Sequence, residues 1–379
     1  RQNDRLLLLN KRGKLIKNRS GHRHKTIPIY ALQRIIMRLF QSANIGLLLL
    51  ALALFLVALA SMTFGAISMD WWDVALATFG AADNPQWNWV VQEIRLPRLV
   101  LGVLVGAGLA VAGAAMQGLF RNPLADPGLV GVSTGAALAA VTVIVLGGSW
   151  LSSWTATAGY YALPFAAFLG GLLVTWLIYQ IASKDGRTDV SLMLLAGIAI
   201  NAIAGALTGI LTYYASDEAL RSLTFWAMGS IASASWRDVG LAGIPIIAAI
   251  ILLPYFAKAL NALLMGERVS QHLGFNVTFA KRGIIVLTAL SVGAAVAVSG
   301  VIGFVGLVAP HLVRLLLGPD HRWVLPGSAL MGAILVVLSD ALARMIVAPA
   351  ELPIGLVMAA IGGPFFLWLL LNRRNRVGF

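Results

Sequence analysis

The sequence contains no cysteine and few charged residues. Of its 379 residues only 11% are Asp, Glu, Lys or Arg. The missing cysteines exclude a disulfide framework, a thiolate metal site, an iron–sulfur cluster and a cysteine nucleophile. The scarcity of charge excludes an ordinary soluble domain, in which about a quarter of the residues are charged.

Groups that would supply energy, from nucleotide or from a coupling ion, are also missing. No G-x-x-x-x-G-K-[ST] phosphate-binding loop occurs, so the chain does not hydrolyse nucleotide by that route. Among the carboxylates only Asp340 falls within a predicted membrane segment, and Arg344 follows it at a helical spacing that lets the two pair. A secondary transporter would need ionisable groups for its coupling ion near mid-membrane. We therefore expect no catalytic residue, metal site or cofactor in this chain.

What the chain does have is apolar sequence. Hydrophobic residues make up 59% of it, and the mean hydropathy is +0.86. A helix needs about 20 apolar residues to cross a bilayer, because its backbone groups must be satisfied within the segment. The sequence therefore predicts an all-α integral membrane protein with ten transmembrane helices, at about 45–64, 96–118, 127–147, 161–182, 190–214, 239–257, 281–299, 301–317, 324–345 and 353–371. Spans seven and eight would meet in a very tight turn at Ser299 and Gly300.

The basic residues predict how these spans are oriented. The chain carries 28 Lys and Arg against 15 Asp and Glu, and in so apolar a chain this surplus points to membrane sidedness rather than to nucleic acid. With the amino terminus inside, 23 basic residues fall in cytoplasmic pieces and five in outside pieces. The positive-inside bias then favours ten spans with both termini in the cytoplasm.

Three regions follow from this topology. Residues 1–44 form a basic cytoplasmic tail, residues 45–371 the ten-span permease domain, and residues 372–379 a short cytoplasmic tail. A cleavable signal peptide ending near Ala60 is the alternative for the first apolar run. That run is long enough to span and lies far from the amino end, so we expect a retained helix.

The segment RNPLADP interrupts the apolar sequence between spans two and three. Arg121 marks a cytoplasmic helix end, and Pro123 biases Asn122 away from helical geometry. Asp126 is placed to cap span three, with Pro127 at its first helical position. The motif is at least a membrane turn.

An internal repeat links spans two and seven. The segment VGAGLAVAG at Val105–Gly113 matches VGAAVAVSG at Val292–Gly300 at six of nine positions. The copies are five spans apart, so they cross the membrane in opposite directions. An inverted repeat, here spans 2–5 and 7–10, is typical of transporters, whose substrate path lies at the repeat interface.

Several motifs, in order along the chain, resemble the FecCD family of membrane permeases from iron-chelate and cobalamin ABC importers, and the match covers about residues 45 to 371. The matching segments are RLPR (Arg95–Arg98), RNPLADPG (Arg121–Gly128), LAGIAINA (Leu195–Ala202), FWAMGS (Phe225–Ser230), the GE…LG loop (Gly266–Gly274), GFVGLVAPHLVR (Gly303–Arg314), DHRW (Asp320–Trp323) and AELPIG (Ala350–Gly355).

The resemblance implies an assembly in the bacterial inner membrane. The permease would pair with a second copy of itself, take power from two cytoplasmic ATPases that bind the ATP, and receive cargo from a periplasmic or lipoprotein substrate-binding protein. Binding-protein docking would fall to Arg95, Arg98 and Arg344 near the outer mouth. Within the cytoplasmic loop at about 258–280, ATPase coupling would fall to Gly266, Glu267, Leu273 and Gly274. The resemblance also suggests that RNPLADP is more than a turn, namely a cytoplasmic hinge or a contact with an ATPase. Candidate path-lining residues are Asn201, Phe225, Trp226 and Met228.

The cargo implied by the resemblance is a large metal chelate. Haem is favoured, with a ferric siderophore or cobalamin as the alternative on the same machinery. We expect no histidine inside a span, with His272, His311 and His321 at or near the cytoplasmic face, so haem would pass without axial ligation by histidine. The different-class alternatives are a secondary transporter and a non-transporting scaffold or sensor.

Overall fold

A computed structural model describes residues 43–64, 69–184, 187–348 and 350–374. The predicted amino-terminal tail therefore lies outside the described residues except for Ala43 and Asn44. The carboxyl-terminal tail is described only as far as Arg374, which still belongs to the last helix.

The described chain is helical apart from one short pair of strands. The long helices are α3 (Ala43–Thr63), α6 (Leu96–Leu119), α7 (Val132–Leu146), α9 (Ala162–Ala182), α10 (Val190–Tyr213), α12 (Trp236–Leu252), α15 (Val277–Ser299), α16 (Val305–Leu317), α17 (His321–Ile346) and α18 (Ile354–Arg374). Shorter helices are α4 (Trp71–Thr78), α5 (Pro85–Trp89), α8 (Ser152–Ala158), α11 (Asp217–Ala227), α13 (Ala257–Leu263) and α14 (Glu267–His272). Between α5 and α6 the chain forms the π-helix η1 (Val90–Arg95), and the remaining elements are the 3-10 turns η2 (Pro127–Val130), η3 (Gly159–Tyr161) and η4 (Leu253–Phe256). Strands β1 (Ser183–Lys184) and β2 (Arg187–Thr188) pair antiparallel in the α9–α10 loop, a small departure from the all-α prediction.

Each of the ten predicted spans contains a helix. Seven helical segments among the described residues are long and apolar enough to cross a membrane: Ala43–Thr63, Pro85–Leu119, Ser152–Ala182, Val190–Tyr213, Trp236–Leu263, Val277–Ser299 and His321–Ile346. The other three windows hold shorter apolar helices, Val132–Leu146, Val305–Leu317 and Ile354–Leu369. The protein is a multi-pass membrane protein.

Two helices begin later than predicted because the chain first turns in a non-helical conformation. Residues 127–130 form the 3-10 turn η2, and Gly131 then adopts a φ of 80° before α7 starts at Val132. The predicted tight turn at Ser299 and Gly300 is wrong in a similar way. Residues 300–304 are not helical, Phe304 has a φ of 66°, and α16 begins only at Val305.

The core is built around α6, whose face is rich in glycine and alanine. A Cβ added at Gly106 would collide with the backbone of Gly332 in α17, and one at Gly113 would collide with Gly306 in α16. The absence of these Cβ atoms lets three helix backbones approach closely, as small residues do in membrane bundles. Close backbone packing therefore fixes α6 at the centre of the bundle.

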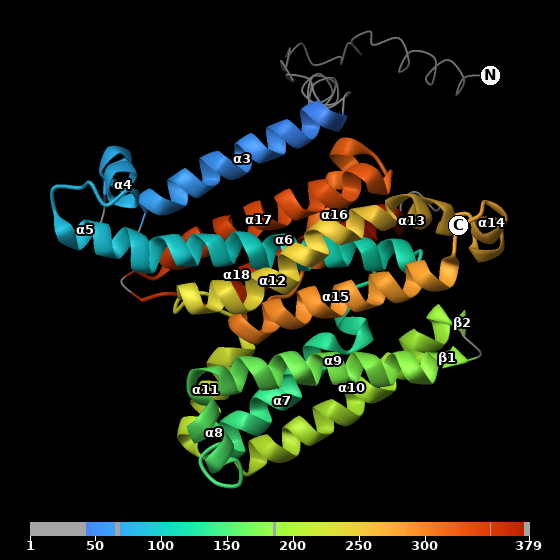
Figure 1. Ribbon diagram of the computed structural model, residues 1–379, viewed down its shortest axis with the longest axis horizontal. Helices are drawn as coiled ribbons and strands as arrows, with labels where there is room; N and C mark the ends of the chain where they lie inside the picture. The colour runs from blue at the N-terminus through green and yellow to red at the C-terminus, as the bar shows by residue number, and fades with distance from the viewer. Residues whose placement is uncertain (1–42, 65–68, 185–186, 349, 375–379) are drawn as a thin grey trace, which may run out of the picture. The chain divides into compact units, whose positions relative to one another are not determined.

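The packing follows the predicted inverted repeat. Helix α6 packs against α16 and α17 of the other repeat, and α15 packs against α7 and α9 of the first. The two copies of the matched segment thus occupy equivalent positions, each covered by the second and third helices of the opposite repeat. Figure 1 shows α6 and α15 running side by side through the bundle.

Loops and short helices gather at two opposite ends of the bundle. In Figure 1, α4, α5, α8 and α11 lie at the left, and α13, α14, β1 and β2 lie at the right. We call the first the outer end and the second the inner end, following the sidedness that the basic residues predict. The two candidate sites described next lie at these ends.

Candidate functional sites at the two ends of the bundle

A cavity of about 410 Å³ opens at the outer end. Its wall is formed by the η3–α9 corner, α11, the segment between α11 and α12, and the end of α15. The predicted path residues Phe225 and Trp226 both line it, whereas Met228 and Asn201 are not among its lining residues. The lining residues are Tyr160, Leu163, Pro164, Phe225, Trp226, Ser230, Ile231, Ser233, Ala234, Asp238, Ala297, Val298, Ser299 and Gly300.

The FWAMGS segment is held in place by backbone contacts. The backbone N–H of Ser230 donates to the carbonyl of Ser299 over 2.7 Å, and that of Gly355 donates to the carbonyl of Gly229 over 3.3 Å. Gly229 has a φ of 67°, and a Cβ there would collide with the Val301 carbonyl. The segment therefore lies where α11, the end of α15 and the start of α18 meet.

Polar groups occupy one side of the cavity. Asp238 is buried, accepts a hydrogen bond from the Tyr160 hydroxyl, and completes a capping box with Ser235 at the start of α12. Its carboxylate is thus fully engaged by neighbouring donors. The aromatic rings of Tyr160, Phe225 and Trp226 give the rest of the wall flat apolar surfaces.

Asn201 lies elsewhere and joins two of the sequence motifs. Its Nδ2 donates to the Gly128 carbonyl over 3.4 Å, and its buried Oδ1 has no hydrogen-bond partner within the described structure. One turn earlier, Gly197 packs directly on the Leu129 carbonyl. LAGIAINA therefore packs on the turn that RNPLADPG forms.

The RNPLADP turn has the predicted local chemistry with one correction. Asp126 accepts a hydrogen bond from Gly128 N over 2.7 Å, but it caps the 3-10 turn η2, with Pro127 at its first position, rather than α7 itself. Asn122 accepts from Leu124 N over 2.9 Å, and Arg121 adopts a φ of 50°. Burial raises the pKa of the Asp126 carboxyl above its ordinary value.

The three predicted docking arginines share the outer end but are engaged within the chain. Arg98 Nη2 lies 2.8 Å from Asp340 Oδ1, and Arg98 Nη1 lies 2.9 Å from Glu351 Oε2. Arg344 Nη2 lies 3.2 Å from Asp340 Oδ2, which confirms the predicted pairing of Asp340 with Arg344. The sequence did not reveal Arg98 as the second partner, because 242 positions separate it from Asp340.

Two of these arginines also hold the end of α3. Arg95 donates to the Met62 carbonyl, and Arg344 donates to the Phe64 carbonyl over 2.8 Å and to Ser61 Oγ over 2.7 Å. Arg95 and Arg98 are each only 7% exposed. Their docking role remains a prediction. The guanidinium groups already form hydrogen bonds and ion pairs within the chain, so a binding protein would contact them only at the edge of this cluster.

The predicted coupling loop forms α14 at the inner end. Gly266, with a φ of 107°, precedes the helix, and Gly274, with a φ of 86°, follows it. Glu267 Oε1 lies 2.7 Å from Lys281 Nζ at the start of α15. Glu267 is thus bound to the permease itself, while Leu273 at the end of the loop is 59% exposed.

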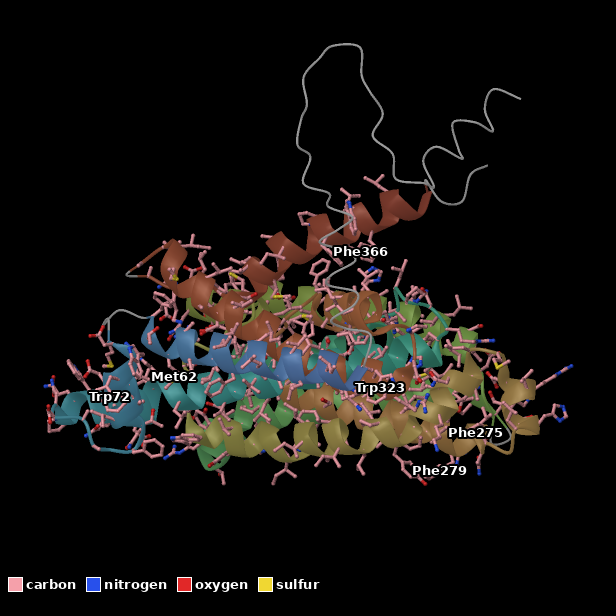
Figure 2. The ribbon with its side chains drawn as sticks, turned by 90° about the horizontal axis from the view of Figure 1, so that it is seen from above. Met62, Trp72, Phe275, Phe279, Trp323 and Phe366 are labelled. Carbon is pink, nitrogen blue, oxygen red and sulfur yellow. The ribbon has the colours of Figure 1, made fainter. Side chains whose placement is uncertain are left out.

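An apolar patch surrounds α14. Met265, Val269, Leu273 and Phe279 are all exposed although all are large and hydrophobic. Figure 2 shows Phe275 and Phe279 at the end of the bundle opposite Trp72. Large exposed apolar side chains at an end built of loops and short helices are typical of an interaction surface.

One histidine departs from expectation. His311 lies within α16, six positions after its first residue, with its ring centroid 5.8 Å from that of Phe365 in α18. The expectation that no histidine lies inside a span is therefore wrong for His311. His321 is the first residue of α17, and its Nδ1 lies 2.8 Å from Asn261 Oδ1 at the inner end.

Comparison with known proteins shows which proteins this chain resembles. The model of the FecCD transport family matches residues 50–372. The hemin transport system permease protein HmuU of Yersinia pestis is 45% identical over 336 residues, covering 88% of this chain and 96% of that protein. The cobalamin import system permease protein BtuC of Halobacterium salinarum is 42% identical over 299 residues, covering 79% of this chain and 77% of that protein.

A solved structure is also similar. It describes an inward-facing conformation of a protein assigned to the metal-chelate type of ABC transporter. Its chain superimposes with a TM-score of 0.76 at 32% identity, covering 86% of this chain and 98% of that chain. The similarity therefore extends over nearly the whole membrane domain.

The helical fold and these similarities identify a multi-pass permease of the bacterial inner membrane. The chain belongs to the FecCD transport family. It is accordingly the membrane subunit of an ABC importer, and the ATPase is a separate protein.

Proposed function

We propose that this chain moves haem across the inner membrane as the permease of a binding-protein-dependent importer. The observation that carries the proposal is the outer cavity, whose aromatic side chains Tyr160, Phe225 and Trp226 offer flat apolar surfaces to a planar macrocycle. The 45% identity to a hemin permease over 96% of that protein supports the same cargo.

Cobalamin or a ferric siderophore is the second candidate cargo. Its support is the 42% identity to cobalamin permeases, such as the BtuC protein of Halobacterium salinarum. Both cargoes are large chelates that would use the same entry at the outer end. The competing secondary-transport mechanism has no support in the described residues, because Asp340 is held between two arginines.

The ten-helix topology and a pair of identical subunits are part of this proposal. Only 22% of the apolar window of α10 is buried within the chain. Its exposed face carries Leu195, Ile198, Ile203 and Ile210, and the exposed Tyr213 stands at its outer end. A second copy packed near this helix and α11 would enclose a path of low polarity that continues from the cavity.

The two ends would bind different partners. At the inner end, the exposed apolar residues around α14 supply a surface for an ATPase that binds ATP. At the outer end, a substrate-binding protein would dock near Arg95, Arg98 and Arg344. Charges at such an interface mainly set the encounter rate and the register of the two proteins.

Reconstitution tests the proposal. The permease, its ATPase and its binding protein are placed in proteoliposomes, and ATP-dependent uptake of haem, a ferric siderophore and cobalamin is measured in parallel. We expect haem uptake that requires ATP and the loaded binding protein. Uptake of another chelate alone would replace haem as the cargo, and uptake by the permease without the ATPase would refute the class.

A further inference from the structure

A buried lysine connects the coupling loop to the rest of the inner end. Lys281 is 3% exposed, near the start of α15. Its Nζ donates to Glu267 Oε1 over 2.7 Å and to the Thr188 carbonyl over 2.6 Å. One ammonium group therefore joins α14, α15 and the strand pair of the α9–α10 loop.

Both hydrogen bonds of Lys281 are costly to break. A buried ammonium without partners carries a large desolvation cost, so removing either acceptor destabilises the charge. The Glu267 side chain is 40% exposed, whereas that of Lys281 is 4% exposed. The lysine is the buried member of the pair, and α14 is seated through it.

The Thr188 bond leads directly to α10. Thr188 ends β2, and the next residue, Asp189, caps α10 by accepting from Ser191 N over 2.8 Å and from Leu192 N over 3.2 Å. Asp189 N also donates to the Ala182 carbonyl at the end of α9 over 2.9 Å. Two hydrogen bonds of Lys281, the peptide bond from Thr188 to Asp189 and the Asp189 cap thus connect α14 to the first turn of α10.

Helix α10 is a suitable element to move. Only 22% of its apolar window is buried, and its main contacts within the chain are with α7, α9 and η2. By contrast, α6 and α15 are buried over 78% and 72% of their apolar windows. A displacement at the inner end therefore meets less packing resistance along α10 than along either central helix.

We propose that Lys281 is a positioning residue that transmits movement of α14 to the inner end of α10. The inference rests on the proposed function, because the movement of α14 is attributed to the ATPase bound there. It adds a specific link: the ATPase acts on the path-facing helix through one ammonium group and the Thr188 carbonyl.

The test compares Lys281→Met with Lys281→Arg and with Lys258→Met. Methionine keeps the length and apolar stem of lysine but donates no hydrogen bond, whereas arginine retains donors for both acceptors. Lys258 lies on α13 at the same end, is exposed, and makes no hydrogen bond or ion pair within the described structure, so Lys258→Met removes the same charge as a control. Each variant is assembled with the ATPase and binding protein in proteoliposomes.

For Lys281→Met we expect the ATPase to co-purify and hydrolyse ATP, while uptake per ATP falls at least tenfold and hydrolysis no longer responds to the loaded binding protein. Lys281→Arg should recover most of the uptake, and Lys258→Met should match the wild type. Wild-type uptake per ATP in Lys281→Met would overturn the inference. Absence of ATP-driven uptake in the wild-type assembly would instead refute the proposed function.

A second measurement tests the inference even if Lys281→Met does not fold. Glu267→Gln leaves Lys281 bonded to Thr188 and replaces the ion pair with α14 by a weaker hydrogen bond to a neutral amide oxygen. Because it changes only a partly exposed side chain, we expect the fold to be retained. Because the chain has no cysteine, Gln271→Cys on α14 and Ser191→Cys on α10 allow a spin-label distance to be measured without background. ATP binding should shift this distance in the wild type and shift it less in Glu267→Gln. Equal shifts would contradict the link.

Discussion

Arg98 and Asp340 form a buried two-point ion pair that joins α6 to α17. Arg98 Nη2 lies 2.8 Å and Nε 3.0 Å from Asp340 Oδ1, and both residues are less than 10% exposed. Asp340 also bonds Arg344, whose guanidinium holds the end of α3. The residues predicted to receive a binding protein are therefore also residues that hold the outer end together.

Removing the charge at the centre of this cluster should destabilise the permease. In Asp340→Asn two buried guanidinium groups share a neutral acceptor, and breaking a buried pair costs about 3–5 kcal/mol. We expect the melting temperature in detergent to fall well below that of the wild type. Glu351→Gln is the matched control with a smaller expected decrease, because the Glu351 side chain is 38% exposed. Equal melting temperatures for all three proteins would show that the pair adds no stability.

The close approach of α6 and α17 gives a sharper test of the packing. Gly106→Ala introduces a Cβ into the Gly332 backbone, and overpacking of this kind costs about 1–3 kcal/mol. Gly240→Ala, in α12, meets no atom within 4 Å and should be neutral or stabilising by up to about 1 kcal/mol. Thermal melting of the two proteins in detergent measures the difference. A Gly106→Ala protein as stable as Gly240→Ala would contradict the close packing.

The RNPLADP turn should matter for coupling as well as for folding. Pro123 lies in an apolar groove with His311 and Phe366 of α16 and α18, and Pro127 starts η2, on which Asn201 packs. Replacing both prolines with alanine should therefore lower ATP-coupled uptake several-fold in proteoliposomes.

The control for this double variant is Pro85→Ala, which changes the first position of α5, an exposed outer helix. It should transport as the wild type does. Unchanged uptake in the double variant, with normal assembly, would reduce the motif to turn chemistry alone.

The aromatic wall of the outer cavity should select the cargo. Trp226→Ala removes a flat surface from the wall, and aromatic contacts of this type contribute about 0.5–1.5 kcal/mol beyond their area. We expect haem uptake to fall several-fold and the ratio of haem to cobalamin uptake to fall with it. Trp150→Ala, at a side chain that is 90% exposed and outside the cavity, is the control and should leave that ratio unchanged. If Trp226→Ala leaves the ratio of haem to cobalamin uptake unchanged, Trp226 does not line the path.

Much of this architecture could be predicted from the sequence because it depends on local patterns. Apolar runs located the helices, the matched segments located the repeat, and the i,i+4 spacing paired Asp340 with Arg344. The features that were missed depend on distant residues. Arg98 meets Asp340, and Lys281 meets Thr188, only because the helices pack as they do. Similarly, the late starts of α7 and α16 follow from positive φ values at Gly131 and Phe304, and hydropathy does not report backbone angles.

The sidedness of the two ends tests the account most directly, since the proposed function has cargo enter at the cavity and the ATPase act on α14 from the opposite side. The cysteine-free chain allows single substitutions, Gln271→Cys on α14 and Asp217→Cys on α11, each at an exposed position. A membrane-impermeant maleimide is applied to intact spheroplasts and to inside-out vesicles. We predict that Asp217→Cys reacts only in spheroplasts and Gln271→Cys only in inside-out vesicles. Labelling of both positions from the same side would contradict the account.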